Sequence, residues 1–211
     1  MELLAALATR FRGLVERLGG TFEASVLDRV YYAWNGPSRH YHDGRHLVEC
    51  LMEVDAVGAG DVAELALWYH DVIYVVGQHD CEEQSAVMLL ADAKTLGIPE
   101  ATAKEAAELV RATAHANGRG APAADLVVDI DLSILGRDPK RFMEYELDVE
   151  KEYAAIPTPA FRKGRGNFLE KFLERPSLFA TEHFHQKYEA QARANIEALL
   201  ASPRYTDFRV E

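Results

Sequence analysis

Four residues combine the side-chain types and the spacing of a metal centre: His46, the adjacent pair His70 and Asp71, and Asp131. Two imidazoles and two carboxylates form a mixed nitrogen and oxygen ligand set. Such a set suits Mn²⁺, Co²⁺, Ni²⁺, Fe²⁺ or Zn²⁺ and contains too much nitrogen for Ca²⁺. A divalent ion held by these groups would lower the pKa of a bound water molecule and so activate it. The four residues therefore predict a site for one transition-type metal ion.

Each of these residues also has a structural explanation. A histidine where a helix is predicted to begin, as at His46, is commonly a capping or structural residue. His70 at a helix C-terminus interacts favourably with the helix dipole, but Asp71 beside it does not. Asp131 lies among Val, Ile and Leu, where burying a carboxylate without a partner is strongly unfavourable. The two aspartates therefore require a cation, which a metal ion would supply.

Helices are predicted around all four residues. His46 stands at the start of a helix that begins near Arg45 and is ended by Gly58 and Gly60. The pair at 70 and 71 falls in the last turn of the next helix, and Gly97 is expected to cap the helix that follows. Adjacent helical residues point about 100° apart, so the pair can converge on one ion only from such a helix end. Further helices are predicted at residues 1–20, 22–34, 80–96 and 99–115, from 138 to 153, from 158, and from 181 to 200.

Acidic residues mark two of the predicted helix starts. Asp61 with Glu64, and Asp80 with Glu83, have the spacing of a capping box in which an aspartate replaces the usual serine or threonine. The segment LVVDIDLSIL at 126–135 is ambiguous, because its apolar residues alternate as in a half-buried strand but also fit one face of a helix. An isolated strand would have no partner in a helical chain, so we predict a helix.

The composition sets the broad class of protein. A chain of 211 residues with 48% hydrophobic and 27% charged residues is ordinary for a globular domain. A formal net charge of −11 and the lack of a Lys/Arg cluster argue against an extended nucleic-acid partner. No window is apolar enough for a membrane span. Cys50 and Cys81 are too few for a disulfide framework and predict buried thiols in a reducing compartment. The first helix shows no small-residue cleavage site, so we expect a cytoplasmic location.

The sequence resembles the His-Asp, or HD, superfamily of metal-dependent phosphohydrolases. The superfamily pattern of His, then His-Asp, then Asp is present in the correct order at His46, His70, Asp71 and Asp131. The chain is further similar to a small branch of predicted HD hydrolases over most of its length. The segments that carry this similarity are RHYHDGRHL at 39–47, LWYHDVIY at 67–74, CEEQSA at 81–86, DIDLSILG at 129–136 and FRKGRGNFLEKFL at 161–173.

The resemblance implies an all-α, single-domain HD-type helical bundle over residues 1–211, in which these four residues bind the metal. It implies an enzyme that hydrolyses a small phosphate ester, such as a nucleotide, with metal-activated water. Superfamily members with two metals have two further histidines before the last aspartate. Here only His79 and His115 lie in that interval, and His79 follows the pair too closely. We therefore expect one divalent ion, which could be Mn, Co, Ni, Fe, Zn or Mg.

Other residues are candidates for supporting roles in such a reaction. Asp71 as a ligand, and Asp80 or Glu83 as carboxylates close behind it, could steer the water or protonate the leaving group. The alternative for Asp80 and Glu83 is the capping box. Phosphate also needs donors with positive charge, for which the candidates are Arg45, His115 and Arg165, the last in a predicted KGRGN turn. Each could instead be a helix-end or surface residue.

Two other functions use the same scaffold. One is a metal-binding or nucleotide-binding sensing module with little turnover, and the other is an HD-type iron oxygenase, against which the shortage of histidines counts. The expected partner is a small phosphorylated molecule, and the sequence leaves homo-oligomer formation open. The remaining histidines are interpreted as surface or capping groups, with His42 the strongest exception because it lies in a loop; the others are His40, His183 and His185.

Overall fold

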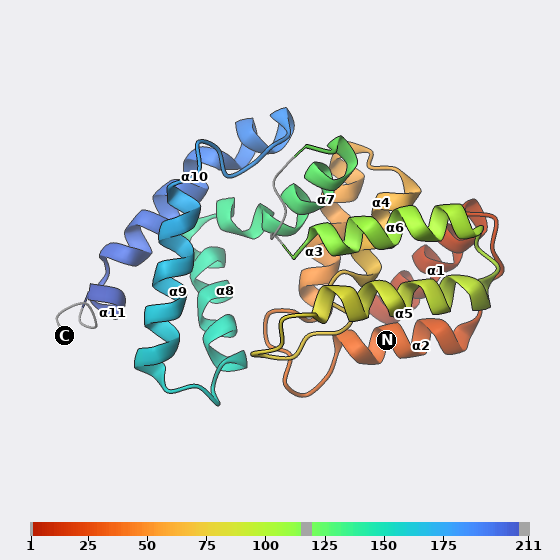
Figure 1. The fold of residues 1–211 in the computed structure, drawn as a ribbon, viewed down its shortest axis with the longest axis horizontal. Coiled ribbons are helices and arrows are strands. Elements are labelled where there is room, and N and C mark those ends of the chain that lie inside the picture. The colour runs from red at the N-terminus through yellow and green to blue at the C-terminus, as the bar shows by residue number, and fades with distance from the viewer. Residues whose placement is uncertain (1, 115–119, 207–211) are drawn as a thin grey trace. The chain divides into compact units, whose positions relative to one another are not determined.

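The computed structural model describes residues 2–114 and 120–206, and this part of the chain contains helices and no strand (Figure 1). The prediction of an all-α fold is confirmed. The ambiguous segment at 126–135 is helical, which excludes the strand alternative. The elements are α1 (Glu2–Arg17), α2 (Ala24–Trp34), α3 (Gly44–Val57), α4 (Asp61–Tyr69), α5 (Cys81–Leu96), α6 (Glu100–Ala112), α7 (Pro122–Leu132), the 3-10 helix η1 (Ser133–Gly136), α8 (Pro139–Glu152), α9 (Thr158–Leu173), α10 (Glu182–Ala201) and α11 (Pro203–Thr206).

The chain divides into two compact units, Met1–Val128 and Asp129–Glu211. The first contains α1 to α6 and the beginning of α7, and the second contains the end of α7, η1 and α8 to α11. The boundary falls inside a continuous helix. The assignment of residues 1–211 to one domain stays a prediction.

Helix α4 is the centre of the first unit. Residues 63–69 are all buried, and the helix contacts α1, α3, α5 and α6. A helix that is apolar on all sides must be covered on all sides, which explains this position. Phe11 of α1 meets Trp68 of α4 edge to face, with ring centroids 5.0 Å apart. This packing fixes the helix that ends directly before His70.

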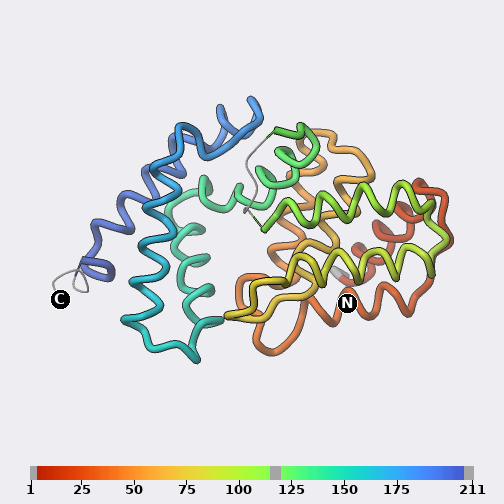
Figure 2. The backbone as a smooth tube through the Cα atoms, in the orientation of Figure 1, coloured from red at the N-terminus to blue at the C-terminus, as the bar shows by residue number. Residues whose placement is uncertain are grey.

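Helices α5 and α6 lie side by side, as the tube in Figure 2 shows. Small buried residues face inward from both helices, including Ala86 and Ala93 of α5 and Ala106 and Ala107 of α6. Because alanine has no side chain beyond Cβ, two helices can approach closely along such faces. Together they cover one side of α4.

The helix ends agree with the sequence patterns at several points. The side chain of Asp43 accepts hydrogen bonds from the backbone N–H groups of Arg45 and His46, which caps the start of α3. Gly58 and Gly97 end α3 and α5 in the left-handed conformation, with φ of 63° and 72°. The predicted boundaries of these two helices are therefore confirmed.

The two predicted capping boxes are wrong. Helix α4 is preceded by Gly60, and Asp61 lies within it and binds Arg17. Glu64 is buried and accepts from Arg10 at 2.7 Å, so its role is to join α4 to α1. Asp80 precedes α5 but makes no capping hydrogen bond. Long-range ion pairs and other local bonds have replaced the local caps that the spacing predicted.

In the second unit, η1 packs closely against α10. A Cβ atom at Gly136 would lie 2.5 Å from the Cβ of Tyr188, so only glycine allows this approach. Asn195 of α10 donates to the carbonyl oxygens of Leu135 and Arg137, both at 2.8 Å. The segment that follows Asp131 is thereby fastened to α10.

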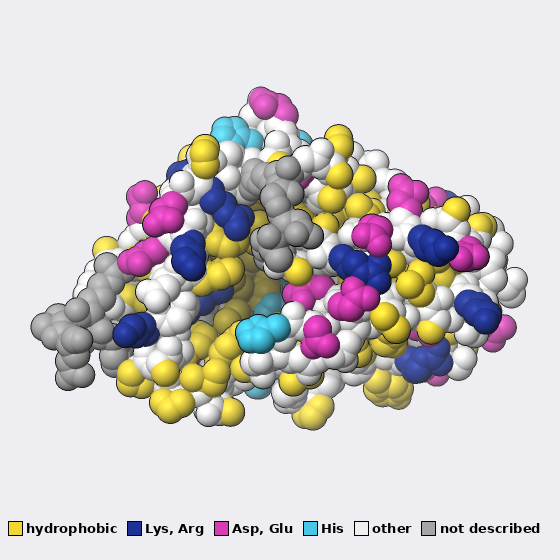
Figure 3. Space-filling view, in the orientation of Figure 1, with side chains coloured by type: hydrophobic (Ala, Val, Ile, Leu, Met, Phe, Trp, Pro, Cys, Tyr) yellow, Lys and Arg dark blue, Asp and Glu magenta, His cyan; other side chains and the backbone are white. Residues whose placement is uncertain are grey.

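The surface over α5 and α6 carries interspersed acidic and basic side chains (Figure 3). Two of the pairs are Glu83 with Arg111 and Glu100 with Lys104.

Among the helices that the structure describes, none has both the length and the apolar character needed to cross a bilayer.

Candidate metal centre

His46 is one of two histidines that are buried in the first unit. It lies in the first turn of α3 and is only 2% exposed. Its Nδ1 lies 3.0 Å from the hydroxyl of Tyr41, and its Nε2 lies 3.1 Å from the Nε2 of His70. The tyrosine thus holds one nitrogen of the ring while the other is directed at the second histidine.

His70 follows the last residue of α4 and is 1% exposed. Its Nδ1 lies 2.8 Å from the carbonyl oxygen of Leu67. Because a carbonyl oxygen only accepts, Nδ1 must carry the proton, and Nε2 of the neutral ring then presents its lone pair. This is the tautomer in which a histidine binds a metal ion through Nε2 while a backbone carbonyl orients the ring.

Asp71 completes a convergence of three ligand atoms. Its Oδ2 lies 3.1 Å from Nε2 of His70 and 3.6 Å from Nε2 of His46. Ligand atoms about 2.1 Å from one ion and about 90° apart are separated by roughly 3 Å, so these separations match a shared ion. The structure thus brings His46, His70 and Asp71 together, and their role as metal ligands stays a prediction. Such a convergence of acceptors is favourable when a proton or a metal ion lies among them.

Cys50 joins this group, and the sequence analysis missed it. The ligand atoms of His46, Cys50 and His70 all lie within 4.8 Å of one another, so these buried residues could hold a metal ion. The available signal was the spacing, since residues four apart lie on the same face of a helix. However, Sγ is 3.8 Å from both ring nitrogens of His46. Equal distances place the sulfur beside the ring and off the axis of the Nε2 lone pair.

Asp131, the remaining predicted ligand, lies half-buried in the last turn of α7. It belongs to the second unit, three residues beyond Val128. Its neighbour Asp129 is fully buried and accepts hydrogen bonds from Ala180 and Thr181. Asp129 was not singled out from the sequence, and these hydrogen bonds hold it to the backbone at residues 180–181. The role of Asp131 as a ligand stays a prediction.

An aromatic and cationic layer surrounds the two histidines. The ring of the fully buried Trp34 lies 5.3 Å from that of His70, and its indole N–H donates to the carbonyl oxygen of Trp68 at 2.9 Å. Arg39 donates to backbone carbonyl oxygens on both sides of the site, including that of Asp71 at 2.7 Å. These groups hold the end of α4 in place, and neither was among the residues proposed from the sequence.

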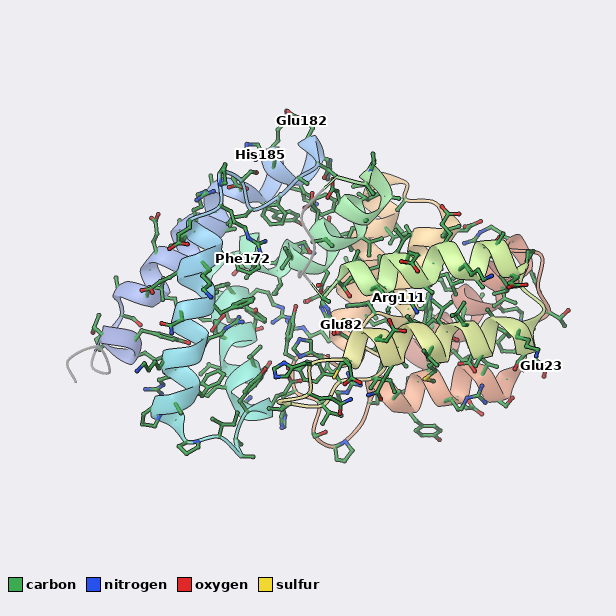
Figure 4. The ribbon with its side chains drawn as sticks, in the orientation of Figure 1. Glu23, Glu82, Arg111, Phe172, Glu182 and His185 are labelled. Atoms are coloured by element: carbon green, nitrogen blue, oxygen red, sulfur yellow. The ribbon has the colours of Figure 1, made fainter. Side chains whose placement is uncertain are left out.

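The two proposed acid–base carboxylates lie at the exposed start of α5. Asp80 accepts a hydrogen bond from Gln84, which, with a second from Gln78, lowers the pKa of its carboxyl group. The two carboxylate oxygens of Glu83 accept from Nε and Nη2 of Arg111 at 2.6 and 2.8 Å, and this pairing lowers the pKa of Glu83. Figure 4 shows Arg111 on α6 directed toward the start of α5. Both groups are therefore ionised acceptors at neutral pH, and their catalytic roles stay predictions.

The structure describes two of the three residues that were proposed to contact phosphate. Arg45 is exposed on α3, where its Nε lies 3.4 Å from Glu49. His115 lies outside the described residues. The predicted KGRGN turn is wrong, because α9 continues through it, and Arg165 binds the buried Glu146 at 2.6 Å. Burial works to lower the pKa of Arg165, but Glu146 and Tyr145 hold it well above its usual value.

The described histidines outside the ligand cluster lie in loops and near the start of α10. His42 stacks on Tyr74, with ring centroids 3.9 Å apart. His185 lies near the start of α10 (Figure 4), with Nδ1 3.0 Å from the hydroxyl of Ser177, and His183 is exposed beside Phe184. The structure thus places His42 in a packed loop.

Comparison with known proteins identifies no relative: no family model, no curated protein and no solved structure matches this chain.

Proposed function

We propose that this protein is a metal-dependent phosphohydrolase of the HD type, which binds one divalent ion through His46, His70, Asp71 and Asp131. The observation that carries the proposal is the convergence of Nε2 of His46, Nε2 of His70 and Oδ2 of Asp71 within 3.6 Å. A mixed set of imidazole and carboxylate ligands at this separation suits Mn²⁺, Co²⁺, Fe²⁺ or Zn²⁺.

The residues around the ligands support a preorganised site. Tyr41 and the carbonyl oxygen of Leu67 each hold the second nitrogen of one imidazole, so both rings are oriented before an ion arrives. Trp34 packs beside both rings and keeps bulk water from that side. A divalent ion held by these residues would lower the pKa of a bound water molecule and polarise a phosphoryl oxygen. Asp71 can accept a hydrogen bond from that water when its second oxygen is oriented toward it.

The choice of phosphate esters as substrates rests on the resemblance to the HD superfamily, and Arg45 is the exposed cation nearest in sequence to a ligand. In the proposed reaction Arg45 contacts the phosphate, while Asp131 supplies the second carboxylate ligand from the end of α7. Its half-buried position among apolar neighbours is where a carboxylate benefits most from a cation.

The proposal is tested in two steps. First, the metal content of the purified chain is measured, with about one divalent ion per chain expected. Second, release of phosphate is measured from nucleotides and sugar phosphates in the presence of Mn²⁺ or Co²⁺, with His70→Ala as the inactive variant and His183→Ala as the matched control. Tight metal binding without turnover on any substrate would leave a sensing module, and two irons per chain would favour an oxygenase.

A further inference from the structure

Arg39 joins the two loops that flank the metal ligands. Its Nη1 donates to the carbonyl oxygens of His42 at 2.8 Å and Asp71 at 2.7 Å, and its Nη2 donates to that of Val72 at 2.9 Å. The guanidinium lies 5.6 Å from the centre of the Tyr74 ring and 5.9 Å from that of Trp34. One side chain therefore holds three backbone carbonyl groups within an aromatic layer.

This arrangement matters because Asp71 lies outside the regular part of α4. The helix ends at Tyr69. It is followed by a turn in which the backbone N–H of Val72 donates to the carbonyl oxygen of Tyr69. The direction of the Asp71 side chain depends on the backbone conformation at residue 71. Arg39 binds the carbonyl groups of residues 71 and 72, so it fixes both peptide planes that follow the Asp71 side chain.

The opposite loop is held by the same side chain. The carbonyl oxygen of His42 lies between Tyr41, which bonds to His46, and Asp43, which caps the helix that carries His46. Arg39 thus connects the segment that orients one imidazole with the segment that carries the carboxylate. The separation between the Asp71 carboxylate and His46 depends on the same loop, so Arg39 constrains the backbone on both sides of the ligand cluster.

We propose that Arg39 is a positioning residue that sets the metal affinity of the site, by holding Asp71 and the 41–43 segment in the binding geometry. This inference rests on the proposed metal site and adds to it the residue that preorganises it. The planar fork of arginine presents several N–H donors in fixed directions, whereas lysine offers one compact ammonium group. Arg39→Lys therefore keeps the positive charge but loses the simultaneous hydrogen bonds to the three carbonyl groups.

The experiment is a titration of the metal-free protein with Co²⁺, followed by calorimetry and by the visible absorption of the bound ion. The wild type is expected to bind one Co²⁺ per chain, and Arg39→Lys to bind it about 10–100-fold more weakly, the range found for residues that support metal ligands. The matched control is Arg10→Lys, which disrupts an arginine fork on Asp55 in the same unit. It should bind Co²⁺ as the wild type does.

Two further measurements separate positioning from folding. The unfolding midpoint without metal should change no more in Arg39→Lys than in Arg10→Lys, and methylguanidinium added to Arg39→Ala should recover part of the lost affinity. Equal Co²⁺ affinity in Arg39→Lys and wild type would overturn the inference and leave the metal site standing. A selective loss of the metal-free fold would also overturn it, in favour of a structural role. A wild type that binds no Co²⁺ would remove the proposed function itself.

Discussion

The carboxylate at the candidate metal centre of the first unit has different surroundings from the buried carboxylates of the second unit. In the second unit, Glu146 is bound by Arg165, Glu189 accepts from backbone N–H groups and from Arg193, and Asp129 accepts from the 180–181 backbone. In the first unit, Oδ2 of Asp71 lies 3.1 Å from Nε2 of His70 and 3.6 Å from Nε2 of His46. Donors of the chain bind the first three carboxylates, whereas the fourth lies beside the nitrogen atoms of two imidazoles.

This difference predicts which polar groups stabilise the fold and which bind a metal ion. A buried carboxylate that is satisfied by the chain's own donors favours one folded arrangement. Groups that offer lone pairs to a common point gain most of their stabilisation from an added cation. The comparison can be tested by removing members of each kind and measuring whether metal binding or the free energy of unfolding changes.

The largest effect is expected from His70→Ala. Removing a direct ligand should weaken Co²⁺ or Mn²⁺ binding by more than about 100-fold, which exceeds the loss seen for groups that merely support a ligand. Isothermal titration and metal analysis of the purified chain provide the measurement. His183→Ala removes an exposed histidine of α10 and should retain the metal. Equal metal content in both variants would contradict the assignment of the ligand cluster.

Arg165→Met should act on stability and leave metal binding intact. It removes the cation beside Glu146, which is 1% exposed, and breaking such a pair costs about 3–5 kcal/mol of unfolding free energy. The double variant Arg165→Met/Glu146→Leu should recover much of this loss in urea unfolding, because no charge is then left buried. If Arg165→Met instead raised KM for a phosphate substrate at unchanged stability, Arg165 would return as a substrate contact.

Glu189→Gln should produce a smaller, pH-dependent effect. Burial works to raise the pKa of Glu189, but hydrogen bonds from Leu178 and Phe179 and the charge of Arg193 outweigh it and lower that pKa. A lowered pKa in the folded state means that ionised Glu189 stabilises the fold at neutral pH, and that this stability is lost as the pH falls below the unfolded-state value.

The difference in unfolding free energy between wild type and Glu189→Gln should therefore be about 1–3 kcal/mol at pH 7, as for hydrogen bonds to a charged group. Urea unfolding at a series of pH values should show it shrinking through the acidic range near and below the ordinary glutamate pKa. A constant difference at every pH would indicate that the carboxylate charge has no such role.

Cys50→Ser should have the smallest effect. Since Sγ lies beside the His46 ring, off the Nε2 axis, the variant should bind Co²⁺ within about twofold of the wild type. The ultraviolet spectrum of the Co²⁺ protein should also lack a thiolate charge-transfer band in both proteins. Such a band in the wild type that disappears in Cys50→Ser would make Cys50 a ligand.

Much of the helical fold could be predicted from local patterns. Gly58 and Gly97 end their helices as expected, Asp138 caps α8, and the 126–135 segment is helical because α7 and η1 have no strand to pair with in the described chain. The prediction of capping boxes was wrong because an acidic residue near a helix start can equally bind a distant arginine, as Asp61 binds Arg17. Spacing along the chain carries no information about such distant partners.

The sequence by itself determined the helices, the buried thiols and the three residues that could act as ligands, because helix periodicity and side-chain chemistry are local properties. Only the tertiary structure decided that His46 and His70, far apart in the chain, bring their Nε2 atoms to 3.1 Å, and that Tyr41 and Arg39 hold the surrounding loops. These contacts depend on how α3 packs against α4. That packing arises from the shapes of many side chains acting together, so no short motif encodes it.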